Sequence, residues 1–506
     1  SHVELREEQA LDLQRALLGH LERGKTGTRK RAAQCLALLP TLMRESTLGE
    51  SVKTVTDILA SKVAYKGKSD LYTFILGATA RAVGFRFNDY AERALPLLTQ
   101  VCEKTTDDYD EEAIVNIESA LQAIEYFITA CPMCVHGDDK SSAIVALALK
   151  YLSYDPNFDD DETEDMDAYD DDNEGYSDDD DNMYDDEDDD ESWKVRRAAA
   201  KMLGAMLHSV PEATVTSNFD DVIAKLLSRT KDREQSVQLD IFSVIGDVMH
   251  VASKSLAHDP HSALCSKLRA TATEIVRVVV RESSSKWPKT QVAAFTLLSS
   301  IASVFPSVMS DVTDDDVRNT LMAAVERCIE DKSRESSARI EALTFICTVC
   351  ESGNDDALAP FVHAILPSIF AAVADKYYKL VAQALHACAA LVTVLRRDAS
   401  TTMSDEYVKH IKSLLDAVLT KLDASDEDQE VKDAAIHACG VILAQLNDVV
   451  NASDQSRALG LLLERSRNET TRLAAVRAFA MIASSSRPVD LSAVATSIMH
   501  ELTGFV

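Results

Sequence analysis

Glycine and proline, which interrupt helices, are scarce in this sequence, and so are aromatic side chains. Only 6% of the 506 residues are aromatic, and there are 15 glycines and 11 prolines. The 46% of residues that are hydrophobic are dominated by Ala, Leu and Val, a composition typical of many short amphipathic helices. The hydrophobic content is ample for a packed core.

Long apolar runs are also absent. No uncharged apolar stretch reaches the ~18 residues of a membrane-spanning helix, so we expect no membrane partner. The opening residues SHVELREEQA are polar and acidic, unlike a cleavable signal. Ten scattered cysteines, mostly inside apolar helical patterns, indicate reduced, buried thiols. We therefore expect a protein of the cytoplasm and nucleus.

Motifs that carry catalysis or bind a cofactor are missing as well. The sequence has no glycine-rich phosphate loop, no nucleophile elbow and no HExxH motif. Histidines such as His386 and His437 occur singly within helical patterns. We therefore expect neither an enzyme nor a cofactor-binding protein.

Two patterns resemble metal sites, and both are incomplete. Cys131, Cys134 and His136 supply half of a zinc site, whereas a structural zinc ion needs four ligands. The other CxxC pair, Cys347 and Cys350, lies several repeats away. A calcium-loop spacing in an acidic run ends in Asp instead of the bidentate Glu, so we expect no metal there either. Its matching positions are Asp170, Asp172, Glu174, Gly175, Asp178 and Asp181.

The net charge of −31 is concentrated in one segment. Residues 155–191 contain 23 acidic residues and no Lys or Arg, and the rest of the chain has 60 acidic and 52 basic residues. Because no domain carries a basic footprint, we expect no direct binding to nucleic acid. The acidic segment repels itself and can bury little, so the sequence predicts a disordered loop. Within it, Ser177 precedes four aspartates, a context that favours an acidophilic kinase of the casein-kinase type.

A short helical pattern recurs along the chain. It is clearest at 195–204, 431–440 and 471–480, and weaker copies start near Thr28, Leu71, Asn116, Val237, Thr290, Ala338 and Tyr378. Successive copies are 43, 45, 79, 42, 53, 48, 40, 53 and 40 residues apart, mostly near the period of HEAT and armadillo repeats. Apolar residues at i, i+3/i+4 and i+7 require stacking between neighbours. The sequence therefore predicts an all-α HEAT-repeat solenoid over 1–506, a right-handed superhelix of about ten antiparallel helix pairs.

The one long spacing locates the acidic segment. It separates the copies at Asn116 and Val195, and it contains the 37 residues of 155–191. Without that segment 42 residues remain, the length of one ordinary repeat. We therefore expect a solvated loop inside one repeat, and we expect residues 159–190 to be dispensable for folding.

The helical wheel of the copy at Val195 separates a core face from a candidate binding face. The predicted core residues are Val195, Ala199, Met202 and Met206. The opposite side would line the concave surface of a two-layer solenoid. The candidate partner-binding residues there, from this copy and its equivalents, are Lys194, Arg197, Lys201, Leu239, Val292, Ile340, Leu380 and Leu473. The apolar ones either form a partner-binding ridge or are covered by tilted neighbouring helices. Arg196, on another flank, is expected to pair with a turn carboxylate of an adjacent repeat.

Several segments together resemble one known family. Residues 149–156 read Leu-Lys-Tyr-Leu-Ser-Tyr-Asp-Pro, the acidic run follows, and residues 192–201 read Ser-Trp-Lys-Val-Arg-Arg-Ala-Ala-Ala-Lys. Further matches follow in the same order at 375–379, 429–432 and 468–473. In these segments the chain resembles the cullin-associated and neddylation-dissociated protein family. The resemblance covers nearly the whole chain and corresponds to the N-terminal to central part of a longer family sequence.

The resemblance implies a non-enzymatic scaffold. Members of that family wrap around a cullin and its RING subunit when the cullin lacks its ubiquitin-like modifier, and they act as exchange factors for cullin–RING ubiquitin ligases. The chain would be a piece of such a protein, or one subunit of a split protein whose second chain supplies the C-terminal half. An importin-β-type nuclear transport receptor is the alternative, because those receptors are also acidic HEAT solenoids. A phosphatase-type scaffold fits the architecture but not the acidic insertion.

Overall fold

The helical character predicted from the sequence holds throughout the computed structural model. Regular structure in the ranges that the model describes is helical, without a strand. The predicted all-α HEAT-type solenoid is therefore confirmed. The calcium-loop spacing, residues 159–190 and Ser177 lie outside the described residues. The described ranges are 5–64, 69–104, 111–155, 191–311, 315–353, 357–396, 405–425, 427–487 and 489–503.

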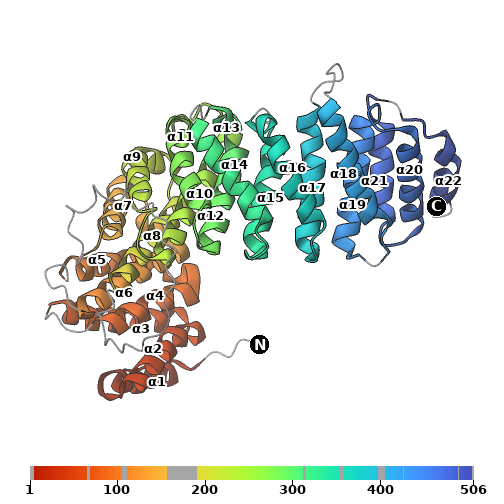
Figure 1. Ribbon diagram of the computed structural model, residues 1–506. Coiled ribbons are helices and arrows are strands. Elements are labelled where there is room, and N and C mark those ends of the chain that lie inside the picture. Colours follow the sequence, from red (N-terminus) through yellow and green to blue (C-terminus); the bar gives the residue numbers. More distant parts are fainter. Residues whose placement is uncertain are drawn as a thin grey trace, which may run out of the picture. The chain divides into compact units, whose positions relative to one another are not determined.

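Contacts between helices divide the chain into two units, Ser1–Val251 and Ala252–Val506. Each unit has the same plan, in which consecutive helices pair and alternate helices stack into two layers (Figure 1). We call these the first-helix layer and the second-helix layer. That both units continue one array over 1–506 stays a prediction.

The first unit begins with four helix pairs. The first-helix layer consists of α1 (Glu7–Arg23), α3 (Glu45–Ala64), α5 (Asn88–Lys104), α7 (Asp138–Leu152) and α9 (Glu212–Ser228). The second-helix layer consists of α2 (Thr26–Leu38), α4 (Asp70–Val83), α6 (Glu111–Ala130) and α8 (Ser192–Ser209). Helix α10 (Gln235–His258) follows α9. Short 3-10 turns follow three of the second helices, namely η1 (Leu39–Leu42), η2 (Gly84–Phe87) and η3 (Pro132–Val135).

The second unit repeats this arrangement. Its first-helix layer contains α11 (Ala263–Ser283), α14 (Asp315–Glu330), α16 (Val362–Val373), α18 (Asp405–Asp423), α20 (Ala452–Arg467) and α22 (Ser492–Thr503). Its second-helix layer contains α12 (Pro288–Val304), α15 (Ser336–Glu351), α17 (Tyr378–Leu395), α19 (Gln429–Leu446) and α21 (Arg472–Ala483). The short α13 (Val308–Asp311) and η7 (Ala359–Phe361) lie in turns.

Helix α8 shows why the repeat pattern folds in this way. The four residues predicted to face the core, Val195, Ala199, Met202 and Met206, are at most 1% exposed. They lie on one side of the helix because their spacing follows the helical period. The predicted core face of this helix is therefore confirmed.

Small residues let neighbouring second helices approach closely. A Cβ added at Gly77 of α4 would lie 2.7 Å from the Cα of Ala123 in α6. One added at Gly440 of α19 would lie 3.0 Å from the Cβ of Ala478 in α21. Because the interior packs at crystal-like density, a larger side chain at Gly77 would force the two helices apart. The high alanine content thus serves the close stacking of the second-helix layer.

A buried ion pair joins α8 to the next repeat. Arg196 is 1% exposed, and its Nε and Nη2 donate to the two carboxylate oxygens of Asp232 at 2.8 and 3.0 Å. Its Nη1 also donates to the Tyr154 carbonyl at 3.1 Å and to the Ser192 hydroxyl at 2.8 Å. The expectation that Arg196 pairs with a turn carboxylate of the adjacent repeat is confirmed. Because Tyr154 and Ser192 flank the acidic segment, one guanidinium holds both of its ends together.

Candidate partner-binding surface

The residues predicted to bind a partner fall on the second-helix layer, and the two units present them differently. In the first unit the candidates on α8 are charged. Lys194 pairs with Glu191, and its Nζ lies 5.8 Å from the ring centroid of Trp193. Arg197 donates to the Asp240 carboxylate of α10 at 2.8 Å, which fixes it across two repeats. These pairs are only partly exposed, and they define the charge pattern of the face.

Lys201 borders a hollow between α4, α6 and α8. The hollow encloses about 570 Å³ and is also lined by Arg81, Glu125 and Tyr126. Desolvation raises the pKa of Glu125, and the nearby Lys201 and Arg81 oppose that rise. The Arg81 guanidinium carbon lies 5.2 Å from the ring centroid of Tyr126, a cation–π distance. The hollow therefore presents a basic and aromatic rim around a partly desolvated carboxylate.

The apolar candidates divide by exposure. Leu239 on α10 and Val292 on α12 are half-buried, as is Ile340 on α15. Leu473 on α21 is 61% exposed, a high value for a leucine. Ile340 and Leu473 line one groove, whereas neither Leu239 nor Val292 lines it. Two of the predicted ridge residues, Ile340 and Leu473, thus line the same groove in the second unit, and a partner-binding role for the ridge stays a prediction.

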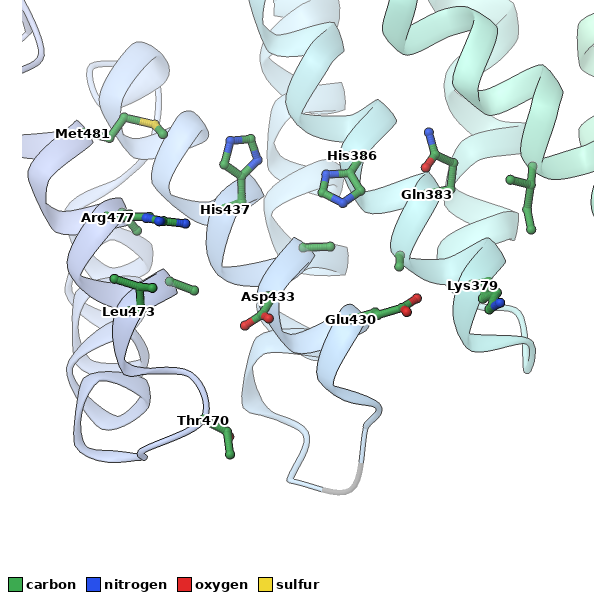
Figure 2. A pocket seen from close by; sticks show the side chains of 15 residues that line it. Lys379, Gln383, His386, Glu430, Asp433, His437, Thr470, Leu473, Arg477 and Met481 are labelled. Carbon is green, nitrogen blue, oxygen red and sulfur yellow. The ribbon is translucent and has the colours of Figure 1, made fainter. Parts of the chain in front are cut away.

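This groove, here called the α17–α21 groove, crosses the second-helix layer (Figure 2). It encloses about 740 Å³. Polar side chains from three helices project into it above a floor of small apolar residues. Its lining consists of Ile340, Lys379, Ala382, Gln383, His386, Glu430, Asp433, Ala434, His437, Thr470, Leu473, Ala474, Arg477, Ala478 and Met481.

The assignment of Leu380 to the binding face is wrong, because Leu380 is fully buried. The turn before α17 shows the reason. Asp375 accepts a hydrogen bond from Arg339 at 3.0 Å, with the 36-residue separation that also relates Asp232 to Arg196. This correspondence aligns Leu380 with the buried Val237, and the position equivalent to Arg197 is then Ala382. The weak copy near Tyr378 had been placed two residues out of register.

Two histidines of the groove carry a chemical feature that the sequence interpretation did not use. His386 and His437 lie on adjacent helices with ring centroids 6.1 Å apart. Desolvation in the groove lowers the pKa of His386, and the nearby Glu351 opposes this. Desolvation also lowers the pKa of His437, and His386 lowers it further. His437 follows Asp433 by four residues, so the i+4 rule finds it from the sequence. His386 follows Ala382 by four residues, and that position was identified only from the structure.

The cysteine pairs behave as packed side chains. Cys131 and Cys134 are buried, and desolvation raises the pKa of these thiols to about 11 and about 12. Cys347 and Cys350 are buried within α15. The described ranges contain no cluster of three or more His, Cys, Asp or Glu side chains arranged to hold a metal ion. In the same ranges, no helix combines the length and the apolar character needed to cross a bilayer.

Comparison with known proteins identifies the chain's relatives. A family model described as CAND1-like, TPR repeats matches residues 313–439. Over 496 residues, 97% of the chain, the sequence is 34% identical to the Cullin-associated NEDD8-dissociated protein 1 of Arabidopsis thaliana. The chain belongs to the cullin-associated NEDD8-dissociated protein family. It is also 30% identical over 501 residues to the Cullin-associated NEDD8-dissociated protein 2 of Mus musculus. It covers 39% of the length of each of these two curated relatives.

Solved structures of karyopherins share the architecture. The structure of Kap95p with RanGDP superposes with a TM-score of 0.70, covering 98% of this chain and 54% of that one, at 13% sequence identity. The karyopherin Kap121p, bound to a segment of the phosphatase Cdc14p, gives a TM-score of 0.50 at 13% identity, with 93% and 46% covered. At such low identity these likenesses show the fold alone.

The four segments after the acidic run that suggested the cullin-associated NEDD8-dissociated protein family share one structural position. Residues 192–201 begin α8, 429–432 begin α19, and 375–379 and 468–473 lead into α17 and α21. Each lies at the start of a second helix or in the turn before it, where side chains cross-link repeats. Asp375 meets Arg339 there, and the Thr471 hydroxyl donates to the Arg465 carbonyl at 2.7 Å.

Proposed function

We propose that this chain is a non-enzymatic scaffold that binds an unmodified cullin–RING core and regulates the assembly of cullin–RING ubiquitin ligases. One observation carries the proposal, namely 34% identity to a cullin-associated NEDD8-dissociated protein along 97% of the chain. The surface chemistry is consistent with it. The second-helix layers present partly exposed side chains and a groove, and protein partners are held through such features rather than through a deep catalytic pocket.

The chain alone accounts for part of the family's length, so we propose a division of the work. The chain supplies contacts to the cullin and its RING subunit, and the C-terminal half of the family sequence, in the same protein or in a second chain, supplies what exchange of substrate receptors requires. We place this complex in the cytoplasm and the nucleus. Phosphorylation of Ser177 would add charge to the acidic segment and tune its attraction to basic partners.

The test is a binding experiment with three immobilised partners: an unmodified cullin–RING core, the same core conjugated to NEDD8, and a Ran-type GTPase loaded with GTP. We expect the chain to bind the unmodified core and to bind the conjugated core at least tenfold more weakly. Equal affinity for both cores would contradict the proposal. Capture by the GTPase alone would support the alternative, an importin-β-type transport receptor, whose present support is the karyopherin-like fold.

Two exposed apolar residues of the second unit provide a matched pair of variants. Leu473 in the groove and Met499 on α22 are 61% and 60% exposed. Leu473→Asp should weaken binding of the unmodified core at least tenfold if the groove contacts the partner, because an anchor would be replaced by a charge that must be desolvated. Met499→Asp should change the affinity less than twofold. Equal effects would remove the groove from the interface.

A further inference from the structure

The α17–α21 groove orders its charges helix by helix. Lys379 belongs to α17, Glu430 and Asp433 belong to α19, and Arg477 belongs to α21. Figure 2 shows Lys379 and Arg477 at opposite ends of the groove with the two carboxylates between them. Three successive second helices therefore present positive, negative and positive charge.

These charges are available to a partner. Lys379, Glu430 and Arg477 are exposed, and within the described part of the chain none of the three forms an ion pair. The Lys379 Nζ lies 5.9 Å from the ring centroid of Tyr378, and Asp433 accepts one hydrogen bond, from Gln429 Nε2 at 2.9 Å. A partner would gain from opposite charges here without first breaking an internal salt bridge.

The floor of the groove between these charged side chains is apolar, so it suits a partner segment that carries an apolar stripe. Ala434 and Ala478 are buried and line the floor of the groove. Because their side chains are small, a partner can approach the helices closely. Leu473 and Met481 from α21 and Ile340 from α15 add larger apolar side chains at the two sides. A segment that fills the groove must therefore be both apolar and charged in a regular order.

We infer that the groove docks one amphipathic helix of the chain's protein partner, laid across α17, α19 and α21, with acidic, basic and acidic side chains facing these helices in turn. Packed helices lie ~8–10 Å apart, and an α-helix rises ~1.5 Å per residue, so the three partner charges would be about five to seven residues apart, and a step of seven keeps them on one face of the helix. A uniformly acidic or uniformly basic segment would gain at one helix and lose at the next. The inference rests on the proposed function only for the identity of the partner as a cullin–RING core.

The first test uses the full chain and designed helical peptides of about 21 residues with a leucine stripe. One peptide carries Glu, Lys and Glu at seven-residue steps beside the stripe, a second carries Lys, Glu and Lys, and compensating charges on the far side equalise their net charge. We expect the first peptide to bind at least tenfold tighter by fluorescence anisotropy, and we expect 0.5 M salt to reduce the difference. Equal binding, or a preference for the second peptide, would overturn the inference.

The second test uses charge reversals and the unmodified cullin–RING core. Arg477→Glu and Glu430→Lys should each weaken binding about tenfold, whereas the controls Lys412→Glu on α18 and Glu464→Lys on α20 should change it less than twofold. Strengthening by either groove variant would show a uniformly charged partner and would contradict the inference. Peptide selection without binding of the core would refute the proposed function alone. Binding of the core without peptide selection and without groove effects would refute the inference alone.

Discussion

Replacing Arg196 by methionine tests whether the buried ion pair between repeats stabilises the fold. The side chains of Arg196 and Asp232 are both 1% exposed, and the guanidinium supplies two of the hydrogen bonds to that carboxylate. Removing one partner of such a pair costs about 3–5 kcal/mol, because the other charge stays buried. Asp232 keeps a hydrogen bond from the Glu234 backbone N–H at 3.0 Å and the cation of Arg229 at 3.9 Å. The neighbouring Asp155 keeps Arg233 at 2.6 Å. We therefore expect a loss of about 3 kcal/mol in the free energy of unfolding.

The double variant Arg196→Met with Asp232→Asn separates the ion pair from packing. It removes both charges of the pair, so it should cost about 1 kcal/mol, well below the sum of the two single variants. Because repeat arrays unfold in segments, hydrogen exchange of the α8 amides should be measured beside urea denaturation. A single-variant loss below ~1 kcal/mol, or additive losses in the double variant, would refute the reasoning.

The second unit contains a natural comparison for this experiment. Arg339 donates to Asp375 at 3.0 Å through one bond, and the Asp375 side chain is 15% exposed, so water partly stabilises that carboxylate. Arg339 also donates to the Ile329 carbonyl at 3.0 Å. Arg339→Met should therefore cost about 2 kcal/mol, less than Arg196→Met. If Arg339→Met cost more than Arg196→Met, burial of the carboxylate would not determine the loss in the free energy of unfolding.

Three further outcomes follow from the structure. Leu380→Asp should lower stability by several kcal/mol because it buries an unpaired charge, whereas Leu473→Asp should stay within ~0.5 kcal/mol in the same urea denaturation. Deleting residues 159–190 should shift the melting temperature by no more than a few degrees, because Tyr154 and Ser192 are already held together; a larger drop in circular dichroism melts would show that the segment packs on the body. The pKa values of His386 and His437 lie below the ordinary value of 6.5, so the folded chain binds fewer protons and should lose stability as the pH falls from 7 through about 6.5. Replacing both histidines with glutamine should flatten that pH dependence of the melting temperature, and an unchanged slope would exclude them as its source.

The sequence by itself determined the helices and the faces that they bury. The period of the apolar residues in α8 places Val195 and Met202 on the core side, and the structure confirms this because a regular helix fixes each side chain's direction from its spacing. The same reasoning placed Arg196 on a flank facing a turn carboxylate. The family resemblance came from short residue motifs in their order along the chain, at 149–156, 192–201, 375–379, 429–432 and 468–473.

Only the tertiary structure decided which of the predicted surface residues are exposed and which of them line the same groove. Leu380 was misassigned because a weak copy of the pattern gives no fixed starting point, and only the contact between Asp375 and Arg339 sets its register. The groove that brings Ile340 and Arg477 together was likewise beyond the sequence, since they lie on helices separated by two complete repeats. Helical periodicity is a local property of the chain, whereas the neighbours of a surface side chain depend on how separate helices stack.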